Sequence, residues 1–248
     1  MFDYDRLLSP TVMSLKKSGI RKFFDLLEEM DDVVSLTVGQ PDFVTPWHIR
    51  EAGIESLERG KTYYTSNAGT LDLRREISAY LSRRFGLVYD PKKEIIVTIG
   101  GSEAIDMTIR TLVTPGDEVI IPEPCFVCYE PLVRMAGGVP VIVDTSAEDK
   151  FKLTPEKLAA AITPRTKLLV LAYPNNPTGA VMTREDLEGI AEVLRPTNIA
   201  ILSDEIYAEL TFGFRHTSIA SLPGMRERTI LASGFSKAYA MTGWRLGY

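Results

Sequence analysis

Short apolar segments rich in β-branched residues recur along the chain from about residue 94 onward. They lie at residues 95–99, 118–121, 139–143, 168–171, 199–202 and 229–231. Because these segments are apolar throughout and do not alternate with polar residues, they predict strands that are buried on both faces, as in a parallel sheet.

Helical patterns fill the stretches between these segments. They lie at residues 102–114, 129–136, 155–161 and 184–195. Two of their starts are marked, because Thr154 precedes a proline and Thr183 stands three residues before Asp186, as in a capping box with a shorter acid. Strands that alternate with helices predict an α/β fold with a mainly parallel sheet.

The chain before residue 94 follows a different pattern. Helical periodicity is found at residues 20–30, 46–58 and 71–85, and a strand-like segment at residues 33–38. We interpret this part as an N-terminal arm that packs on the main sheet.

The amino-acid composition bears on the possible binding partners of the protein. The 248 residues are 45% hydrophobic, and 28 basic against 33 acidic residues give a formal charge of -5. The acidic balance, with no basic block, does not indicate a nucleic-acid partner. The N-terminus lacks a signal-peptide pattern, and no apolar run approaches the ~20 residues that span a bilayer, so no membrane partner and a cytoplasmic location are expected.

Cysteine and histidine are scarce. Cys125 and Cys128 have the spacing of a redox pair or half of a metal site, but no second cysteine pair exists to complete a zinc tetrahedron. His48 and His216 are far apart in the sequence. We therefore expect reduced structural thiols, structural or solvated histidines, and no metal site.

The segment from Ser233 to Arg245 carries the strongest candidate for chemistry. Lys237 lies there among small and apolar neighbours such as Phe235 and Ala238. Such neighbours strip water from an ammonium group and favour its neutral, nucleophilic form, which suits Schiff-base formation with a carbonyl.

Two glycine- or proline-rich motifs follow predicted strands. Gly100-Gly101-Ser102 joins a strand to a helix, so its free backbone N–H groups could bind an anion, preferably phosphate; the alternative is a plain tight turn. The segment 174–179 contains Asn175 and Asn176 between prolines and could present an amide to a ligand, or it could be a turn only.

A carboxylate and a phenol follow a third predicted strand. Asp204 and Tyr207 are three residues apart after the segment 199–202. Asp204 could pair with a ring N–H while Tyr207 faces a neighbouring oxygen, or Asp204 could only cap the next helix.

The order of these motifs resembles that of the pyridoxal-phosphate-dependent aminotransferases of class I and II, a fold-type-I family of the aspartate and aromatic aminotransferase kind. The resemblance runs from about Ser18 to the last residue. It implies the cofactor pyridoxal 5'-phosphate and a mainly parallel, seven-stranded-type sheet sandwiched by helices. Residues 1–45 would be an N-terminal arm or part of a small domain, and residues 46–248 a large domain truncated before its C-terminal end.

The resemblance implies a role for each matching residue. Lys237 forms the Schiff base with the cofactor and later acts as the base, and Asp204 keeps the pyridine nitrogen protonated. Asn176 and Tyr207 hydrogen-bond the phenolate oxygen of the cofactor, and Phe126 stacks on its ring.

The remaining matches concern phosphate, substrate and subunit contacts. Gly101, Ser102 and Arg245 match phosphate-binding positions, with Arg245 as a bidentate clamp. Tyr64 matches a tyrosine that reaches the phosphate of the neighbouring subunit, which predicts a homodimer. Gly39 matches a glycine beside the substrate carboxylate, and Asn176 is also expected near the substrate.

Two departures from the family pattern qualify these expectations. Gly234 stands where many relatives carry a serine that binds the phosphate, so Ser233 or Ser236 replaces it or the contact is missing. The family arginine that binds the substrate carboxylate lies in a C-terminal small domain, which this chain is expected to lack. The cofactor site is therefore expected to be complete and the substrate site incomplete.

The resemblance predicts transamination between an L-amino acid and a 2-oxo acid by a ping-pong mechanism through Lys237. Two alternatives stay open at this point. One is a lyase or decarboxylase on the same fold, and the other is an aminotransferase-like domain that senses a ligand in a regulator. Aspartate, aromatic and branched amino acids are all possible substrates.

Overall fold

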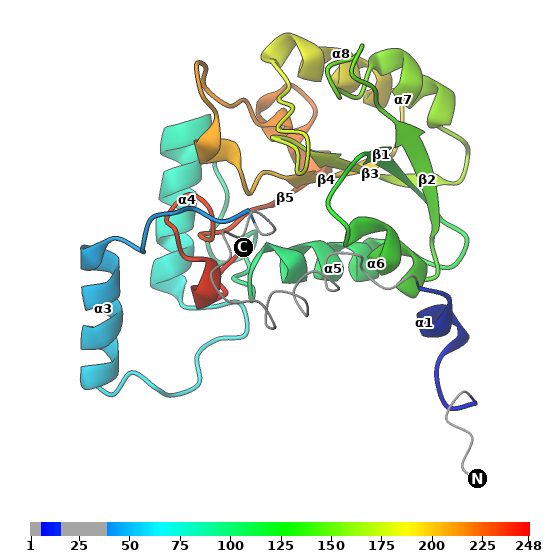
Figure 1. Ribbon diagram of the computed structural model, residues 1–248. Helices are drawn as coiled ribbons and strands as arrows, with labels where there is room; N and C mark the ends of the chain where they lie inside the picture. The colour runs from blue at the N-terminus through cyan, green and yellow to red at the C-terminus, as the bar shows by residue number, and fades with distance from the viewer. Residues whose placement is uncertain (1–5, 16–38) are drawn as a thin grey trace, which may run out of the picture.

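A single parallel sheet of five strands lies at the centre of the computed structural model (Figure 1). Its strands are β1 (Glu118–Glu123), β2 (Val139–Asp144), β3 (Thr166–Ala172), β4 (Ala200–Asp204) and β5 (Thr229–Ala232). They are ordered β2-β1-β3-β4-β5. The chain moves outward from β1 to β2 and then returns to the other side of β1, so the strand order reverses there, and open α/β sheets bind ligands at such a point.

The structure describes residues 6–15 and 39–248. The predicted helix at residues 20–30 and the predicted strand at 33–38 lie outside the described residues. In the described ranges, no helix is long and apolar enough to cross a membrane.

Helices cover both faces of the sheet (Figure 1). One face carries α5 (Gly101–Leu112) and α6 (Tyr129–Met135), and the other carries α7 (Pro155–Ala161) and α8 (Arg184–Leu194). The predicted caps are present: the hydroxyl of Thr154 accepts from the backbone N–H of Lys157, and Thr183 and Asp186 form a capping box. The predicted α/β class with a parallel sheet is confirmed.

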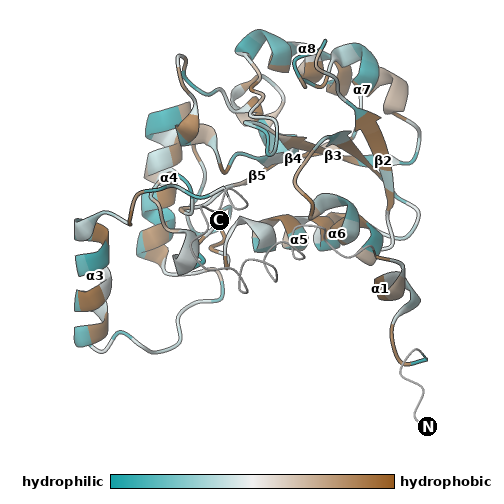
Figure 2. Cartoon of the chain, viewed as in Figure 1, coloured by the Kyte–Doolittle hydropathy of each residue, from teal (hydrophilic) through white to brown (hydrophobic). Residues whose placement is uncertain are grey.

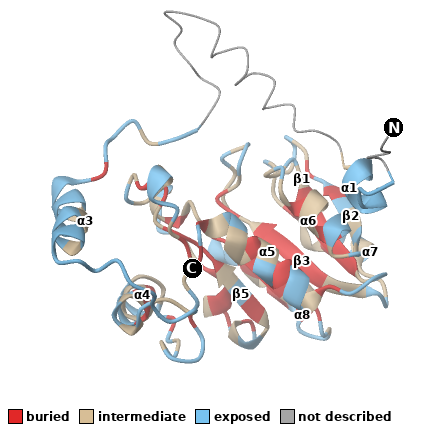
Figure 3. Ribbon diagram, turned by 90° about the horizontal axis from the view of Figure 1, so that it is seen from below, coloured by how far each residue is buried: buried red, intermediate tan, exposed pale blue. Residues whose placement is uncertain are grey.

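Apolar side chains fill the space on both sides of the sheet. Apolar residues recur along the strands (Figure 2), and β1 and β3 are largely buried (Figure 3). The outer strand β2 is mostly exposed or half-buried, so the prediction of burial on both faces is wrong for β2. Leu169 and Ile201 pack with α8 in one core, while Leu168 and Leu202 pack with Ile109 of α5 in the other. Neighbouring residues of one strand thus enter opposite cores, which explains the uninterrupted apolar pattern of the strands.

Other helices lie beside the sheet. They are α1 (Pro10–Ser14), α3 (Trp47–Glu58), α4 (Leu71–Phe85) and the 3-10 turns η1 (Ala208–Leu210), η2 (Ile219–Ser221), η3 (Arg226–Arg228) and η4 (Thr242–Trp244). A third core joins Ile77 and Leu81 of α4 to Ile95 and Tyr248. By contrast, α3 contains no buried residue.

The segment 95–99 does not form the strand that its apolar pattern predicts. Only Thr98 pairs, in an isolated antiparallel bridge with Gly247, which is also bridged to Gly234 just after β5. The order therefore continues from β5 through Gly247 to Thr98, so two bridged segments stand beside five strands. A ladder needs several consecutive pairs, and the segment 95–99 finds one; its apolar residues Ile95 and Val97 pack against the α4 core instead.

Candidate active site

Side chains from the ends of several strands gather at one edge of the sheet. β4 ends at Asp204, while Phe126 follows β1 and Asn176 follows β3. Because the strands are parallel, their carboxyl ends meet at the same edge. The sheet therefore places residues that are far apart in the sequence around one site.

Asp204 is the buried carboxylate of this site. It is 9% exposed, its Oδ2 accepts from the Tyr129 hydroxyl at 2.8 Å, and its Oδ1 accepts from the backbone N–H of Ile206 at 3.1 Å. Burial raises the pKa of Asp204, although both hydrogen bonds act against this rise. Asp204 also has acceptor capacity left, since each carboxylate oxygen has two lone pairs.

Tyr129 is a residue of this site that the sequence reasoning missed. Its side chain is 1% exposed at the start of α6, and its ring meets Phe126 edge-on at 6.1 Å between centroids. A tyrosine in a short amphipathic helix is typical of packing, so the pattern gave no sign of a bond to Asp204. Burial is the main cause of the raised pKa of Tyr129, which therefore stays a hydrogen-bond donor.

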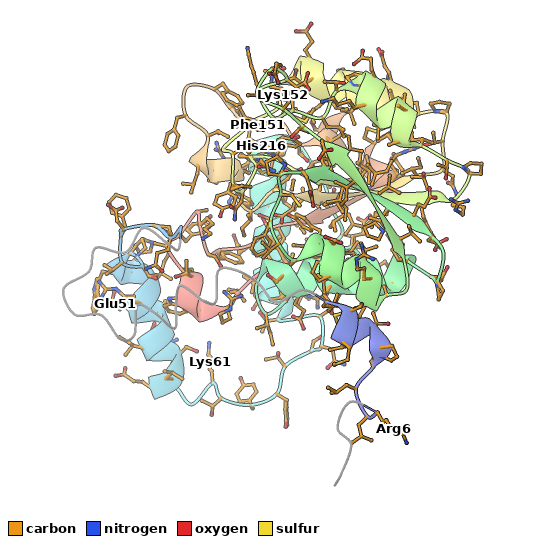
Figure 4. The ribbon with its side chains drawn as sticks, turned by 45° about the vertical axis from the view of Figure 1, so that its right-hand side comes forward. Arg6, Glu51, Lys61, Phe151, Lys152 and His216 are labelled. Atoms are coloured by element: carbon orange, nitrogen blue, oxygen red, sulfur yellow. The ribbon has the colours of Figure 1, made fainter. Side chains whose placement is uncertain are left out.

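The neighbour of Asp204 anchors the end of β4. Glu205 is buried, and its Oε1 accepts from the hydroxyls of Ser203 at 2.8 Å and Ser218 at 2.6 Å. Its Oε2 lies 2.8 Å from Nε2 of His216, whose side chain is directed into the protein (Figure 4). His216 is therefore structural rather than solvated, and it holds the loop before η2 against the strand end.

The N-terminus of α5 has the features expected of an anion site. Its N-cap residue Gly100 has φ +76°, and no side chain caps the helix, so the first N–H groups of α5 have no partner within it. Gly101 is half-buried and Ser102 exposed. The Arg245 guanidinium packs against Gly100 so closely that a Cβ added there would lie 2.4 Å from an Arg245 nitrogen. Backbone donors, a hydroxyl and a cation thus meet at one helix end.

Lys237 extends toward the same site. Its Nζ donates to the carbonyl of Gly39 at 2.6 Å and lies 5.6 Å from the centre of the Tyr207 ring. Burial lowers the pKa of Lys237, and the charge of Arg245 adds to the effect. Burial, followed by the charge of Asp204, raises the pKa of Tyr207. The structure therefore brings Lys237, Tyr207 and Gly39 together.

The backbone around Gly234 leaves little room for a side chain. A Cβ at Gly234 would lie 3.0 Å from the carbonyl oxygen of Leu246 and 3.1 Å from Cα of Gly247. A serine there would meet backbone that is held by the bridge to Gly247. Ser233 and Ser236 are buried, and the Ser233 hydroxyl donates to the Glu205 carbonyl at 3.4 Å. The Ser233 hydroxyl is thus engaged by the residue that follows β4.

The two asparagines of the turn after β3 differ in role. Asn175 is used within the turn, because its Oδ1 accepts from the backbone N–H of Thr178 at 3.1 Å and from its hydroxyl at 2.8 Å. Asn176 is exposed and is the amide that the turn presents. Tyr64 is fully exposed after α3, and among the described residues no side-chain hydrogen bond joins Asn176 or Tyr64 to the other candidate residues.

The cysteines have the surroundings of structural thiols. Cys125 and Cys128 are both free and pack beside Phe126 in the core that includes α5 and α6. Burial raises the pKa of Cys125 to about 12 and raises the pKa of Cys128 further. Since the thiolate is the reactive form, these thiols are poor nucleophiles. In the described ranges, no group of histidine, cysteine and acidic residues is arranged to hold a metal ion.

The arrangement combines three chemical capacities within one edge of the sheet. The amine of Lys237 is shifted toward its nucleophilic form, α5 and Arg245 offer donors to an anion, and Asp204 is a buried acceptor. A ligand that fits all three would carry a carbonyl, a phosphate and a protonated ring nitrogen.

Comparisons with known proteins agree with this reading. The family model described as aminotransferase class I and II matches residues 31–248. The putative aminotransferase YugH of Bacillus subtilis (strain 168) is 58% identical and is matched over 97% of this chain and 62% of its own length. The probable N-acetyl-LL-diaminopimelate aminotransferase of the same strain is 46% identical, over 98% of this chain and 61% of its own length.

A solved structure shows the same fold. The aromatic aminotransferase of Pyrococcus horikoshii OT3 is 47% identical and superimposes with a TM-score of 0.85, over 90% of this chain and 60% of its own. The chain thus spans about three fifths of the length of the relatives it matches.

Proposed function

Because the chain belongs to the class I and II aminotransferases, we propose that it takes part in the transfer of an amino group from an L-amino acid to a 2-oxo acid with pyridoxal 5'-phosphate. One observation carries the proposal. Lys237, whose pKa is lowered, and the buried Asp204 lie at the same edge of the sheet as the uncapped N-terminus of α5.

The residues present fit this cofactor. The free N–H groups of α5, the hydroxyl of Ser102 and the guanidinium of Arg245 suit a phosphate. Asp204 is a carboxylate whose burial is unfavourable without a cation, and a protonated ring nitrogen would offset that cost. Phe126 is a half-buried aromatic beside Asp204's partner Tyr129 and suits stacking on a ring.

Each residue has a defined task in the proposed reaction. When bound, the cofactor supplies an aldehyde and a ring that withdraws electrons from the substrate Cα. Lys237 would hold the cofactor and, once released, move the proton at the substrate Cα. Asp204 would keep the ring nitrogen protonated, and Tyr207 and Asn176 would hydrogen-bond the ring oxygen.

The surroundings of Lys237 support its role as a base. An ammonium group cannot attack a carbonyl or accept a proton, so a lowered pKa increases the reactive fraction near neutral pH. The Gly39 carbonyl, which accepts from Nζ, lies on the substrate side of the lysine in this proposal. Gly39 has no side chain, and a Cβ there would find no atom of the described residues within 4 Å, so a substrate carboxylate could approach its backbone.

We propose a class of substrate but no particular side chain. The relatives are named for different amino acids, so we propose an L-α-amino acid and a 2-oxo acid without choosing a side chain. Their names as aminotransferases favour transamination over the lyase and over the ligand sensor.

We propose that residues 46–248 act as the cofactor-binding domain and residues 1–45 as an arm. We also propose a homodimer in which Tyr64 reaches the phosphate of the second subunit, which suits its fully exposed side chain. A cytoplasmic location stays a prediction.

An absorbance experiment tests the proposal. The protein is mixed with pyridoxal phosphate, and the long-wavelength band of a lysine-bound cofactor is recorded for the wild type, Lys237→Ala and Lys61→Ala. Lys61 is exposed after α3 and is the matched control (Figure 4). We expect the band in the wild type and in Lys61→Ala and its loss in Lys237→Ala. Equal bands in all three proteins would refute the assignment.

A second measurement separates transamination from the alternatives. Amino acids are added to the cofactor-loaded protein, with glutamate first, and conversion to the pyridoxamine form is followed. Loss of the long-wavelength band together with formation of a 2-oxo acid is expected. Release of carbon dioxide or of an unsaturated product without pyridoxamine formation would instead support a lyase.

A further inference from the structure

Thr45 is a buried residue in an otherwise exposed segment. Residues 39–48 are mostly exposed where they lead into α3 (Figure 3), yet Thr45 is 8% exposed. Its Oγ1 donates to the carbonyl of Ala240 at 2.6 Å and accepts from Nε1 of Trp244 at 3.1 Å. One hydroxyl therefore joins this segment to the loop between Lys237 and Arg245 at two points.

Two residues of that loop have backbone torsion angles that are unfavourable for L-amino acids. Among the described residues, four that are not glycine have positive φ, and two of these are Ala240 at +51° and Arg245 at +52°. The left-handed region costs an L-residue of order 1 kcal/mol, so neighbouring contacts must hold it. The carbonyl that Thr45 binds belongs to the first of these residues.

Two more contacts connect the same partners. The carbonyl of Gly39, six residues before Thr45, accepts from Lys237 Nζ at 2.6 Å. The indole of Trp244 packs on Gly53 of α3 so closely that a Cβ at Gly53 would lie 2.9 Å from the ring. Thr45 thus stands at the centre of an attachment that runs from Gly39 to α3.

We propose that Thr45 is a positioning residue. Through its hydrogen bonds with Ala240 and Trp244 it holds the loop 237–245, with Ala240 in the left-handed backbone conformation, and so places Lys237 and Arg245 for the cofactor. This inference rests on the proposed function. Among the described residues, the side-chain hydrogen bonds of Thr45 go to Ala240 and Trp244 and not to Lys237 or Arg245, so Thr45 would act through the loop.

The chemistry of the side chain explains the choice of residue. The contact needs a group that donates to a carbonyl and accepts from an indole N–H at the same time, and a hydroxyl does both. Valine has the same shape without the hydroxyl and would leave the Ala240 carbonyl and the Trp244 N–H unpaired. Serine keeps the hydroxyl and should keep the function.

The first experiment compares Thr45→Val with Thr45→Ser in the cofactor-free protein. The parent and both variants carry Trp47→Phe, so that Trp244 is the only tryptophan in each protein. We expect acrylamide to quench Trp244 fluorescence more strongly in Thr45→Val, because the indole loses its acceptor, and Thr45→Ser to match the parent. Equal quenching in all three proteins would overturn the proposal.

The second experiment measures affinity for pyridoxal phosphate through the lysine-dependent absorption band. Loss of the hydroxyl should weaken binding about tenfold in Thr45→Val, as expected for one or two net hydrogen bonds, and Thr45→Ser should restore it. If Thr45→Val binds the cofactor as the parent does, or if Thr45→Ser binds as poorly as Thr45→Val, the proposal is wrong.

A double-mutant cycle with Ala240→Gly tests the link to the strained backbone. Glycine adopts positive φ without strain, so the loss caused by Thr45→Val should shrink in the Ala240→Gly background. Strictly additive losses would contradict the proposed coupling. Should Thr45→Val fail to fold, the same cycle is run with Thr45→Ala, and unfolding midpoints are recorded for every variant.

The two proposals fail in distinguishable ways. If the parent protein shows no Lys237-dependent band with pyridoxal phosphate, the proposed function fails while the quenching result still decides whether Thr45 holds the loop. If the band forms but Thr45→Val leaves both quenching and affinity unchanged, the function stands and the role of Thr45 is refuted.

Discussion

At the scale of single residues, the site depends on how far each ionisable group is removed from water. Asp204 is buried, and its two hydrogen bonds from Tyr129 and Ile206 only partly oppose the rise of its pKa. Lys237 is half-buried, and its pKa is lowered. Both shifts favour the neutral forms, so without a bound cation Asp204 makes the folded state less stable once it ionises.

A pH-dependent stability difference should follow from Asp204. Its folded pKa is raised, so its favourable contribution is complete below the ordinary aspartate pKa, about 3.9, and is lost as the pH rises through the raised value. Asp204→Asn removes this loss. We expect the cofactor-free variant to gain stability over the wild type as the pH rises from about 4 to about 7.

Denaturant unfolding at several pH values measures this difference. If the difference in free energy of unfolding between Asp204→Asn and the wild type stays constant with pH, the raised pKa of Asp204 is contradicted. Added pyridoxal phosphate should reverse the order, since only the wild type offers a charge to a protonated ring nitrogen, and the thermal shift caused by the cofactor should be smaller in Asp204→Asn.

At the scale of elements, the segments that lie beside β5 are joined by close backbone contacts of Gly247. Gly247 bridges both Thr98 and Gly234, and a Cβ at Gly247 would lie 2.4 Å from the carbonyl carbon of Gly100. These contacts bring the start of α5 next to the segment that leads to Lys237. The absence of side chains at Gly247 and Gly100 therefore allows the N-terminus of α5 to approach the segment that carries Lys237.

Gly234→Ala should disturb this edge. Its added Cβ would meet the Leu246 carbonyl at 3.0 Å, and this backbone cannot move without breaking the bridge at Gly247. We expect a loss of roughly 1–3 kcal/mol in the free energy of unfolding, as for other overpacked sites, and weaker cofactor binding.

The matched control is Gly243→Ala, because in the part of the chain that the structure describes no atom lies within 4 Å of a Cβ at Gly243. Urea unfolding of both variants measures the effect. Equal stability of the two alanine variants would show that the close approach at Gly234 does not matter.

At the scale of the whole molecule, the helix α3 stands apart from the cores. It lies at the side of the molecule, away from the sheet (Figure 1), and contains no buried residue, while Ile54 and Leu57 are exposed apolar side chains. The polar Glu51 and Lys61 also lie at this periphery (Figure 4). Such exposure suits the proposed homodimer, in which Tyr64 belongs to the same region.

Dimerisation should therefore depend on α3. Leu57→Glu replaces an apolar side chain of α3 that is 67% exposed with a charged one. Val88→Glu makes the same kind of change at an equally exposed position away from α3. Burial of a leucine contributes about 1.5–3 kcal/mol, so we expect Leu57→Glu to raise the dimer dissociation constant by at least about tenfold.

Sedimentation at several protein concentrations checks this expectation, with Val88→Glu as the control. If the wild type sediments as a monomer at all concentrations, the proposed dimer is wrong. If both variants dissociate equally, the effect comes from charge and not from the α3 surface.

The sequence by itself determined the local structure. Apolar periodicity and caps such as Thr154 and Thr183 predicted all five strands and the helices from α3 to α8, because a cap is a contact between near neighbours and the spacing of apolar residues follows the period of the element itself. The motif order predicted the family, and Lys237, Asp204 and Gly101 as candidates, because each of these lies in a distinctive turn or strand end.

Only the tertiary structure decided which distant groups meet. It assigned Tyr129 to Asp204, Thr45 to Ala240 and His216 to Glu205, and it left the segment 95–99 with one bridge instead of a ladder. These outcomes depend on the crossing of elements that are far apart in the chain. A hydrogen bond or a strand ladder needs its partner within a few ångströms, and local sequence does not specify that distance.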